Sequence, residues 1–420
     1  MKEPALKPII VERSGHPLSR SMIDPDALFI MRKLRREGHK AYLVGGAVRD
    51  LLLGRAPKDF DIGTDASPSR LRALFPNSRI IGRRFRIIHV FFRRKGEQEK
   101  VIEVSTFRGE RPWDENDRVH PDDRDQTGTA FGTPEEDAWR RDFTVNALFY
   151  NIADFTIIDH TGGLADLDAR TIRLIGDPEK RFAEDPVRML RAVEFAVRLG
   201  FSIDGATVAG ITENAARISE ASPARLREEL RQMHQRGITG EVLSRSLDLG
   251  LFGHLFPTIT PSQAVISLMR ALDKGRNGEA TAEFAYIAAL CMAAMDSAKP
   301  LGAHASLEEV HDEVFPLVGD ICDRYQISAH IRHLARELIL CCYRLSRGRA
   351  YKSKGKFVRR AEFPYALDFY EAWLDASGGN REQLLDWKKY LEERNREQGE
   401  RRPRRRRRPR RRPKQATGEG

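Results

Sequence analysis

The chain is poor in the residues and motifs that mark disulfide-bonded proteins and the common nucleotide-binding folds. It has 4 cysteines in 420 residues, and none shows the spacing of a CxxC or cysteine–histidine metal site. We therefore expect buried thiols in a reducing compartment. No Gly-x₄-Gly-Lys-Ser/Thr or Gly-x-Gly-x-x-Gly sequence occurs, which excludes a P-loop NTPase on motif grounds and gives no support to a dinucleotide site.

Long hydrophobic segments are also missing. The longest apolar run, residues 284–295, has about half the length that a membrane span needs and indicates a core helix. The N-terminus shows no apolar region of a signal peptide, so we expect a cytoplasmic protein. A chain of 420 residues exceeds one ordinary core, and two or three domains are expected.

Positive charge is concentrated near the C-terminus. The net charge is +11, but residues 401–414 hold ten arginines and one lysine, opposed in residues 401–420 by Glu419 alone, so the remainder is nearly neutral. Such an Arg/Pro-rich segment cannot bury a core, and we predict a disordered tail over residues 397–420. This tail would lie along RNA phosphates, with contacts from Arg404, Arg405, Arg406, Arg410 and Arg411.

Two acids one position apart, Asp59 and Asp61, are the most informative feature of the sequence. Residues i and i+2 of a strand point to the same face, so a strand over residues 60–64 would aim both carboxylates at one point. Glu103 lies in a later apolar run and alternates with apolar neighbours, so it also faces away from the apolar side. Converging carboxylates form a hard oxygen site suited to Mg²⁺ ions that a nucleotide triphosphate also coordinates. The pattern predicts nucleotidyl transfer.

Gly45 and Gly46 precede a predicted short helix that ends at Gly54. A Gly-Gly turn before a helix lets main-chain N–H groups approach a phosphate, and Arg49 can add a charge-assisted contact one turn later. Taken alone, these glycines also fit a purely structural turn.

The remaining pattern predicts an α+β protein with its strands in the first part of the chain. We expect a helix from Asp24 to Gly38, strands over residues 41–44, 86–93, 100–108, 156–159 and 171–175, and no regular structure over 109–136. Residues 140–147 are predicted to open a helical stretch, and residues 185–394 are almost wholly helical in period. The predicted parts are an arm (1–23), a head (24–160), a neck (161–235), a helical body (236–396) and the tail (397–420).

Four motifs occur in an order that resembles class II nucleotidyltransferases, the family of bacterial CCA-adding enzymes and bacterial poly(A) polymerases in the polymerase β-like superfamily. They are Gly-Gly-x-Val-Arg-Asp at 45–50, Asp-x-Asp at 59–61, Arg-Arg-Asp-Phe-Thr-x-Asn-Ala at 140–147 and Glu-Asp-Pro-x-Arg-x-Leu-Arg-Ala at 184–192. The resemblance covers residues 24–260 and implies a polymerase β-like head, a small mixed sheet with helices, followed by a helical neck and body.

The resemblance also implies roles for individual residues. Asp59 and Asp61 would ligate two Mg²⁺ ions, with Mn²⁺ as a substitute, and either Glu103 or Asp142 would be the third essential acid. The nucleotide would be held by Gly45, Gly46, Arg49, Arg141, Asn146 and Arg191, and its base would be read by Asp185 and Arg188. Family members often carry a basic residue where this chain has Glu194, so a phosphate contact there is in doubt.

Residues 80–90 resemble the Gly-Arg-Arg-Phe-x-x-x-His-Val stretch of bacterial poly(A) polymerases, and Arg83 and Arg84 are predicted RNA contacts. We therefore predict template-independent addition of AMP from ATP to RNA 3′ ends, linked to mRNA processing and decay, with RNA-decay or RNA-chaperone proteins as partners. CCA addition to tRNA is the alternative within the same chemistry. A catalytically retired RNA-binding module is the second alternative, and the three intact acids argue against it.

Overall fold

The computed structural model describes residues 7–82, 86–94, 96, 98–112, 129–275, 282–298, 301–348, 354–360 and 362–400. The chain divides into two compact units, residues 1–257 and 258–420. The predicted boundaries near residues 160 and 235 both fall inside the first unit. The predicted α+β class is confirmed. Within the described ranges, no helix combines the length and apolar character that a membrane crossing requires.

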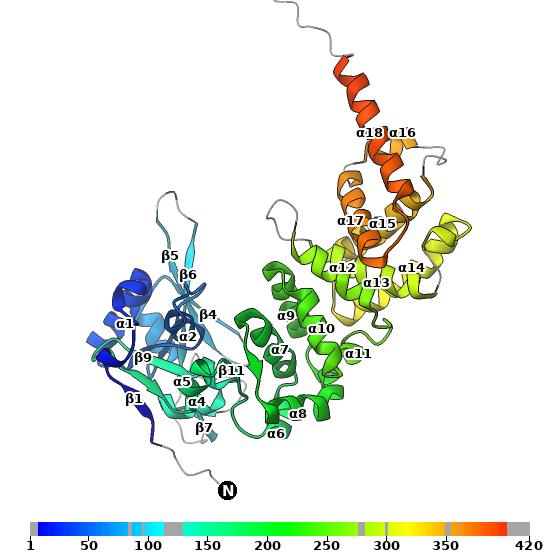
Figure 1. Cartoon of the computed structure of the whole chain (residues 1–420). Coiled ribbons are helices and arrows are strands. Elements are labelled where there is room, and N and C mark those ends of the chain that lie inside the picture. The colour runs from blue at the N-terminus through cyan, green and yellow to red at the C-terminus, as the bar shows by residue number, and fades with distance from the viewer. Residues whose placement is uncertain are drawn as a thin grey trace, which may run out of the picture. The chain divides into compact units, whose positions relative to one another are not determined.

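An eight-stranded mixed sheet forms the centre of the first unit (Figure 1). Its strands are ordered β1-β10-β9-β2-β3-β6-β5-β4, and every neighbouring pair is antiparallel except β3 with β6. The strands are β1 (Ile9–Val11), β2 (Ala41–Val44), β3 (Asp61–Thr64), β4 (Ser78–Ile81), β5 (Ile87–Phe92), β6 (Lys100–Thr106), β9 (Leu148–Asn151) and β10 (Ile157–Asp159). Two small sheets pair β7 (Arg108–Pro112) with β8 (Thr129–Phe131) and β11 (Thr171–Ile172) with β12 (Ser202–Ile203).

One face of the large sheet is buried under helices. Leu43, Ile62, Val104 and Ile88 are neighbours in the register of four adjacent strands, and each is 0% exposed. Helix α1 (Pro25–Arg36) packs over β2 and β3, and α3 (Pro68–Leu74) packs over β4 and β5. This apolar row fixes the register, because a one-residue slip would expose it.

Local signals define the ends of α1 as predicted. The side chain of Asp24 accepts hydrogen bonds from the N–H groups of Asp26 and Ala27, which caps the first turn. At the other end, Gly38 has a φ of +85°, the left-handed conformation that commonly terminates a helix.

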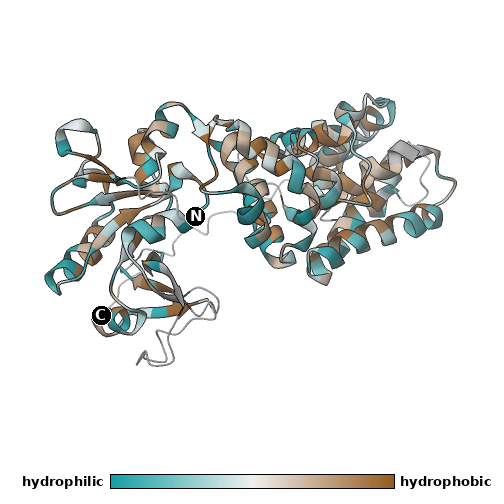
Figure 2. Ribbon diagram, turned by 90° about the horizontal axis from the view of Figure 1, so that it is seen from below, coloured by the Kyte–Doolittle hydropathy of each residue, from teal (hydrophilic) through white to brown (hydrophobic). Residues whose placement is uncertain are grey.

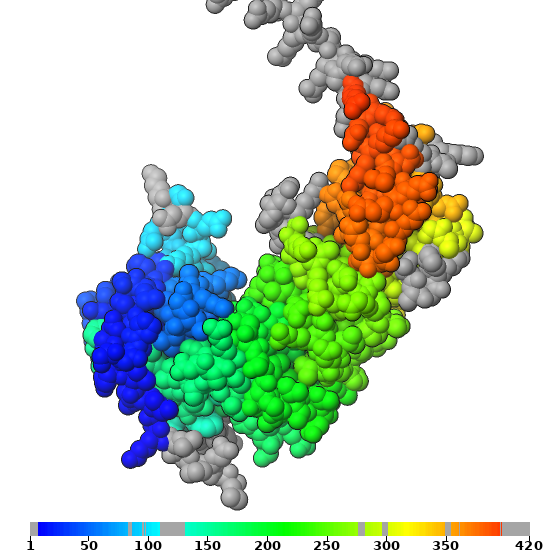
Figure 3. All heavy atoms as spheres, viewed as in Figure 1, coloured from blue at the N-terminus to red at the C-terminus, as the bar shows by residue number. Residues whose placement is uncertain are grey.

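The opposite face of the sheet is covered over only part of its width. A buried cluster covers β2 and β9; its members are Val44, Phe107, Ala138, Ala147, Phe149 and Ile175. Ala138 comes from α4 (Pro134–Arg140). On β4, β5 and β6 the same face carries polar and partly exposed side chains. The β5–β6 hairpin, cyan in Figures 1 and 3, extends past the neighbouring strands.

Helices make up the rest of the first unit. They are α2 (Gly46–Leu52), α5 (Gly163–Asp168), α6 (Pro178–Glu184), α7 (Val187–Leu199), α8 (Gly205–Asn214), α9 (Pro223–Arg236), α10 (Thr239–Asp248) and α11 (Leu251–Leu255). Helix α7 packs against α9 and α10 through apolar residues such as Leu190 and Val193, both 0% exposed. This apolar packing fixes the position of α7 against α9 and α10.

The described part of the second unit is helical. Its α-helices are α12 (Gln263–Asp273), α13 (Glu283–Ala298), α14 (Leu307–Arg324), α15 (Ala329–Ser346), α16 (Lys354–Phe357), α17 (Phe363–Ser377) and α18 (Glu382–Glu400). Helices of the molecule carry both hydrophobic and hydrophilic residues (Figure 2), as expected of helices with one buried face. Trp387 of α18 is 0% exposed and donates a hydrogen bond to the carbonyl oxygen of Leu345 at 3.1 Å, which joins α18 to the end of α15. All four cysteines are buried and free, as predicted.

Several predicted elements were wrong. Residues 9–11, expected in a loose arm, form β1 and pair with β10. Residues 140–147 do not open a helix: α4 ends at Arg140, a 3₁₀ turn spans Thr144–Asn146, and β9 follows. A capping box between Thr133 and Glu136 starts α4 before residue 140, inside the segment predicted to lack regular structure.

The limits of three other elements differ from the predictions. The strand expected over residues 171–175 is only Thr171–Ile172, and α18 continues to Glu400 rather than ending near residue 394. The strand expected to begin at residue 60 begins at Asp61.

Candidate active site

Asp61 and Glu103 lie side by side where β3 and β6 run parallel. Asp61 is the first residue of β3, and the two strands pair so that Ile62 is opposite Val104. One residue earlier on both strands, the same register places Asp61 beside Glu103, on the face opposite to the buried pair. The side chain of Glu103 is 46% exposed, which confirms the prediction that it faces away from the core.

Asp59 reaches this place from the segment before β3. It is exposed and outside the strand, so the expected strand alternation does not position it. Burial, together with the negative charges of Glu103 and Asp59, raises the pKa of Asp61 to about 6 against the opposing effect of Arg141. The three carboxylates therefore share one electrostatic environment, which a bound cation would stabilise.

The donor set fits a hard divalent cation. Carboxylate oxygens are the ligands that Mg²⁺ and Mn²⁺ prefer, and burial, followed by the charges of Glu103 and Asp59, raises the pKa of Asp61, so a cation would stabilise its ionised form. In the ranges that the structure describes, no three His, Cys, Asp or Glu side chains are grouped so as to hold a metal ion by themselves. These acids therefore suit ions that are bound by one or two carboxylates and by the phosphates of a substrate.

A cavity of about 230 Å³ brings these acids together with arginines. It is lined by Val44, Asp61, Ile87, Glu103, Ser105, Arg108, Asp137, Arg140 and Arg141. Guanidinium groups bind phosphate oxygens through charge-assisted hydrogen bonds, so the lining suits a triphosphate accompanied by cations. The sequence-based site did not include Ser105, Arg108, Asp137 or Arg140. The four-residue spacing between Asp137 of α4 and Arg141, which follows the last residue of α4, would have indicated their pairing.

Gly45 and Arg141 are in close contact. Gly45 follows β2 with a φ of +70°, and a Cβ atom there would lie 2.9 Å from Nη1 of Arg141. Glycine is required on both grounds, since other residues rarely adopt this φ and a side chain would displace the guanidinium. Arg141 is also held by Asp137, whose Oδ2 accepts from Nη2 at 2.9 Å and from Nε at 3.1 Å.

Arg49 is buried rather than directed at solvent. Its side chain is 2% exposed and donates to Asn146 Oδ1 and, at 2.7 Å and 2.8 Å, to Asp50 Oδ1. Its guanidinium also lies over the ring of Phe195, 5.4 Å from the centroid. In this structure Arg49 therefore orients Asn146.

A chain of hydrogen bonds continues from Asn146 to the neck helices. Asn146 Nδ2 donates to Asp142 Oδ1 at 3.2 Å, and Arg191 of α7 donates to Asp142 Oδ2. Arg191 also donates to Glu229 of α9 at 3.1 Å. Burial raises the pKa of Asp142, but the Arg191 guanidinium and the hydrogen bonds outweigh it, and the net pKa is lowered. Asp142 is therefore a charged group that its neighbours hold in place. Glu229 belongs to this hydrogen-bonded chain, and sequence reasoning did not identify it.

The two residues predicted to read the base have partners inside the protein. Both oxygens of Asp185 accept from Arg225, at 2.7 Å and 2.8 Å. Nη1 of Arg188 donates to the carbonyl oxygen of Arg181 at 2.8 Å and to Glu184 at 3.1 Å. Sequence reasoning missed Arg225, because no local pattern relates it to a residue 40 positions away.

Glu194 is buried in α7 at 2% exposure. It accepts a hydrogen bond from Arg236 at 2.7 Å and lies 3.0 Å from Nε of Arg198. The acid thus neutralises one arginine of α7 and one of α9. The predicted RNA contacts Arg83, Arg84, Arg404, Arg405, Arg406, Arg410 and Arg411 lie outside the described residues.

Two segments of the chain match known families. Residues 41–173 match the poly A polymerase head domain, and residues 200–262 match the probable RNA and SrmB-binding site of polymerase A. The chain is 37% identical to poly(A) polymerase I of Salmonella typhi, over 90% of this chain and 84% of that protein. It is 36% identical to poly(A) polymerase I of Escherichia coli O157:H7 with the same coverage.

CCA-adding enzymes are also similar. That of Geobacillus kaustophilus is 37% identical over 54% of both chains. Among solved structures, a CCA-adding enzyme in complex with CTP aligns with a TM-score of 0.63, at 22% identity, over 92% of this chain and 87% of that chain. The same enzyme type in complex with ATP aligns with a TM-score of 0.61 at 22% identity, over 92% and 85% of the two chains. These structural matches establish a shared fold.

Proposed function

The chain belongs to the bacterial poly(A) polymerase family and is a polynucleotide adenylyltransferase, and from this membership we propose that its head transfers AMP from ATP to RNA 3′ ends with the help of two divalent metal ions. The observation that carries the proposal is the cavity in which Asp61 and Glu103 meet Arg141 beside Gly45. Acids for cations and arginines for phosphates are what nucleotidyl transfer requires.

Asp59 and Asp61 hold the two ions in this proposal, and Glu103 borders the 3′-OH of the RNA. Bound divalent ions lower the pKa of that hydroxyl and stabilise the negative charge of the pyrophosphate leaving group. Asp61 suits this role because burial, and then the charges of Glu103 and Asp59, raise its pKa to about 6, so a bound cation would stabilise its ionised form.

The triphosphate lies on the β2 side of the acids. Gly45 has no side chain that would displace the Arg141 guanidinium, and Asp137 orients this guanidinium, which contacts the phosphates. Asn146 and Asp142 form the sugar side of the site, held in place from behind by Arg49 and Arg191. Both arginines therefore act through the residues they position.

Asp185 and Arg188 read the adenine. Arg225 uses one lone pair on each oxygen of Asp185, and an ionised carboxylate has further lone pairs that can accept from the amino group of adenine. The bonds of Arg188 to Arg181 and Glu184 both use Nη1, so Nε and Nη2 are the atoms we assign to the base. Arg225 is the positioning residue for Asp185.

The substrate is RNA in general rather than one tRNA, and the role is in mRNA processing and decay. The Arg-rich segment from residue 401 supports this assignment, because phosphate contacts carry no sequence preference. RNA-decay or RNA-chaperone proteins are the partners we propose, in line with the family description matched by residues 200–262.

The experiment is single-nucleotide incorporation. Purified protein is incubated with a 3′-hydroxyl RNA and each of the four NTPs in turn, with Mg²⁺, and product length is read on a gel. The proposal expects long extension with ATP alone. A tRNA lacking its terminal CCA that, with CTP and ATP supplied together, accepts two C and one A and nothing more would show CCA addition instead. No incorporation with any RNA or NTP would indicate the catalytically retired alternative.

A further inference from the structure

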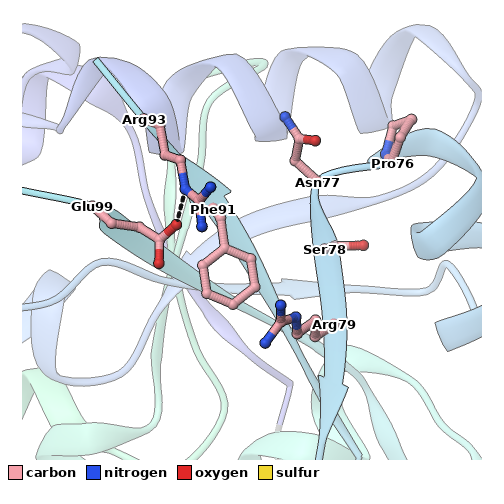
Figure 4. A pocket seen from close by; sticks show the side chains of 7 residues that line it. All are labelled: Pro76, Asn77, Ser78, Arg79, Phe91, Arg93 and Glu99. Carbon is pink, nitrogen blue, oxygen red and sulfur yellow. Dashed lines mark hydrogen bonds and ion pairs between the residues drawn. The ribbon is translucent and has the colours of Figure 1, made fainter. Parts of the chain in front are cut away.

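The outward face of β5 runs from the acid cavity to a second cavity in the head. Alternate residues of β5 and its end point to this face: Ile87, His89, Phe91 and Arg93. Ile87 lines the acid cavity described above. Phe91 and Arg93 line another cavity of about 380 Å³ (Figure 4). His89 lies between them, with Nε2 3.2 Å from Oε1 of Glu103 and its ring 6.4 Å from that of Phe91.

The strand register shows on which side of the acids this second cavity lies. Glu103 is opposite His89, and His89 is opposite Arg79 of β4. The strands that follow Asp61 therefore lead through Glu103 toward Arg79, whereas Gly45 and Arg141 lie on the other side, next to β2. If the triphosphate lies on the Arg141 side of the acids, the Arg79 side remains for the RNA strand. The 3′ end of that strand would then reach the acids from Arg79.

The lining has the chemistry of a single-stranded nucleic acid site. Phe91 is partly exposed, and the Arg79 guanidinium lies 5.6 Å from its ring centroid. Arg93 is 79% exposed at its side chain and forms an ion pair with Glu99 through Nε. Figure 4 shows Phe91 between the Arg93–Glu99 pair and Arg79. An aromatic ring flanked by arginines combines base stacking with phosphate contacts.

An apolar neighbour extends the stacking surface. Val101 of β6 is the cross-strand partner of Phe91 and is 39% exposed. Asn77 and Ser78 add polar groups at the edge of the cavity. The cavity thus has an aromatic and aliphatic centre with arginines beside it. A nucleotide, which has both a base and a phosphate, fits this lining better than a purely apolar or a purely anionic ligand.

We propose that Phe91, Arg79 and Arg93 form a binding platform for the RNA nucleotides that precede the 3′ end. Phe91 stacks on one base, and the two arginines contact flanking phosphates. This platform rests on the proposed function of the head, since it supplies the RNA strand to Glu103 and Asp61. It adds a sequence-independent subsite within the head itself, separate from the basic tail.

The test measures RNA binding without catalysis. The full-length protein is titrated against a fluorescent single-stranded oligo(A) RNA, without ATP, and the dissociation constant is read by anisotropy. Phe91→Leu keeps the apolar bulk but removes the ring, and it should weaken binding about 5-fold to 100-fold, whereas Phe91→Tyr should retain most of the affinity. The double variant Arg79→Gln/Arg93→Gln should reduce the slope of log K against log salt by about 0.7 for each lost phosphate contact.

Matched control variants lie on α1, over the covered face of the sheet. Phe29 is 51% exposed and packs against Phe92, which points away from Phe91, so Phe29→Leu should leave RNA affinity unchanged. Arg36 is also exposed at the end of α1, and Arg36→Gln removes one charge from the helix that packs on the other face of the sheet. Both controls test whether any aromatic or positive charge on the head would give the same effect.

Steady-state kinetics distinguish the platform from the proposed function. In a wild type that extends RNA with ATP, Phe91→Leu should raise KM for RNA while leaving kcat at saturating RNA and KM for ATP nearly unchanged. Wild-type RNA affinity and salt slope in both Phe91→Leu and Arg79→Gln/Arg93→Gln would overturn the platform, and a protein ligand for this cavity would then be the better explanation. A wild type that binds RNA but transfers no AMP would instead refute the proposed function, and the binding comparison would still decide on the platform.

Discussion

Asp142 and Arg191 form the ion pair that connects the segment after α4 to helix α7, because one oxygen, Asp142 Oδ2, accepts hydrogen bonds from both Nε and Nη2 of Arg191, at 3.0 Å and 2.8 Å. The residues are 49 positions apart in the chain. The carboxylate of Asp142 thus joins the wall proposed for the sugar to the helix proposed to read the base. Substitutions at this pair should affect both.

The stability of the first unit should depend on this pair. The side chains of Asp142 and Arg191 are only 15% and 29% exposed, so Asp142→Asn would leave a largely buried guanidinium without its main partner. We expect a loss of about 3 kcal/mol in the free energy of unfolding, measured by urea denaturation. Arg191→Gln should cost a similar amount, and the double variant should cost less than the sum of the two. Fully additive costs would show that the two groups are not coupled.

Asp61→Asn should abolish AMP transfer without unfolding the protein. The substitution preserves the shape of the side chain and removes the charge that a cation requires, and it also relieves the repulsion from Glu103 and Asp59. Melting temperature should therefore be unchanged or slightly higher, while incorporation falls to background at saturating Mg²⁺. Glu37→Gln, at a 40% exposed acid on the head surface, is the matched control and should remain active. Near wild-type incorporation by Asp61→Asn would disprove the metal assignment.

Arg188→Ala should weaken nucleotide selectivity more than it slows the reaction. Losing one or two hydrogen bonds to adenine should reduce discrimination between ATP and the other NTPs by about 1–3 kcal/mol, measured as the ratio of kcat/KM values. Arg217→Ala removes a neck arginine that pairs with Glu220 and should leave that ratio unchanged. Equal slowing with all four NTPs would point to a triphosphate contact or a structural role for Arg188.

Removing residues 401–420 should weaken RNA binding and make it less dependent on salt. The deletion removes ten arginines and one lysine but leaves α18 intact to Glu400. The slope of log K against log salt should fall by about 0.7 for each lost phosphate contact, with kcat at saturating RNA and the preference for ATP nearly unchanged. A full-length variant with the tail arginines changed to lysine should keep the slope, because it keeps the charge. An identical slope in full-length and truncated proteins would rule out RNA binding by the tail.

Acid should destabilise the first unit through His234. Burial lowers the pKa of His234 to about 3, and its Nδ1 lies 3.0 Å from Thr239 Oγ1. An unfolded histidine has a pKa of about 6.5, so between these values the unfolded state binds a proton that the folded state does not. The stability contribution is complete above about pH 6.5 and is lost as pH falls below it, by at most about 1.4 kcal/mol per pH unit. Urea denaturation at pH 7 and pH 5 should show this loss in the wild type and a smaller loss in His234→Gln.

Local signals allowed part of this structure to be predicted. Asp24 and Gly38 mark the ends of α1, and β2 lies where its apolar run predicted. The helical continuation expected after residue 147 was wrong because Leu148–Asn151, which forms β9, is buried apart from its last residue and so lacks the alternation that distinguishes a strand from a buried helix segment. The sequence also gave no indication that residues 9–11 would pair with β10, since that contact is set by the sheet and not by local propensity.

In the candidate site, too, spacing predicted some residues and could not predict their partners. The Asp-x-Asp spacing placed Asp59 and Asp61 together even though only Asp61 belongs to a strand, because two residues of extended chain cannot separate them far. The partners of the other predicted residues could not be read from spacing. Arg225 on Asp185 and Glu229 on Arg191 are contacts between helices distant in the sequence, which depend on how α7 and α9 pack.

The parallel pairing of β3 with β6 has a consequence for how the enzyme becomes active during folding. Strands β4, β5 and β6 are consecutive antiparallel neighbours, so they can form a meander from contacts close in the chain. Asp61 and Glu103 come together only when this meander joins β3, a step that closes a much longer loop and is therefore slower. Metal affinity should thus appear late in refolding, after most secondary structure has formed. A nascent chain would remain inactive until the meander has docked, which separates the acquisition of structure from the acquisition of catalysis.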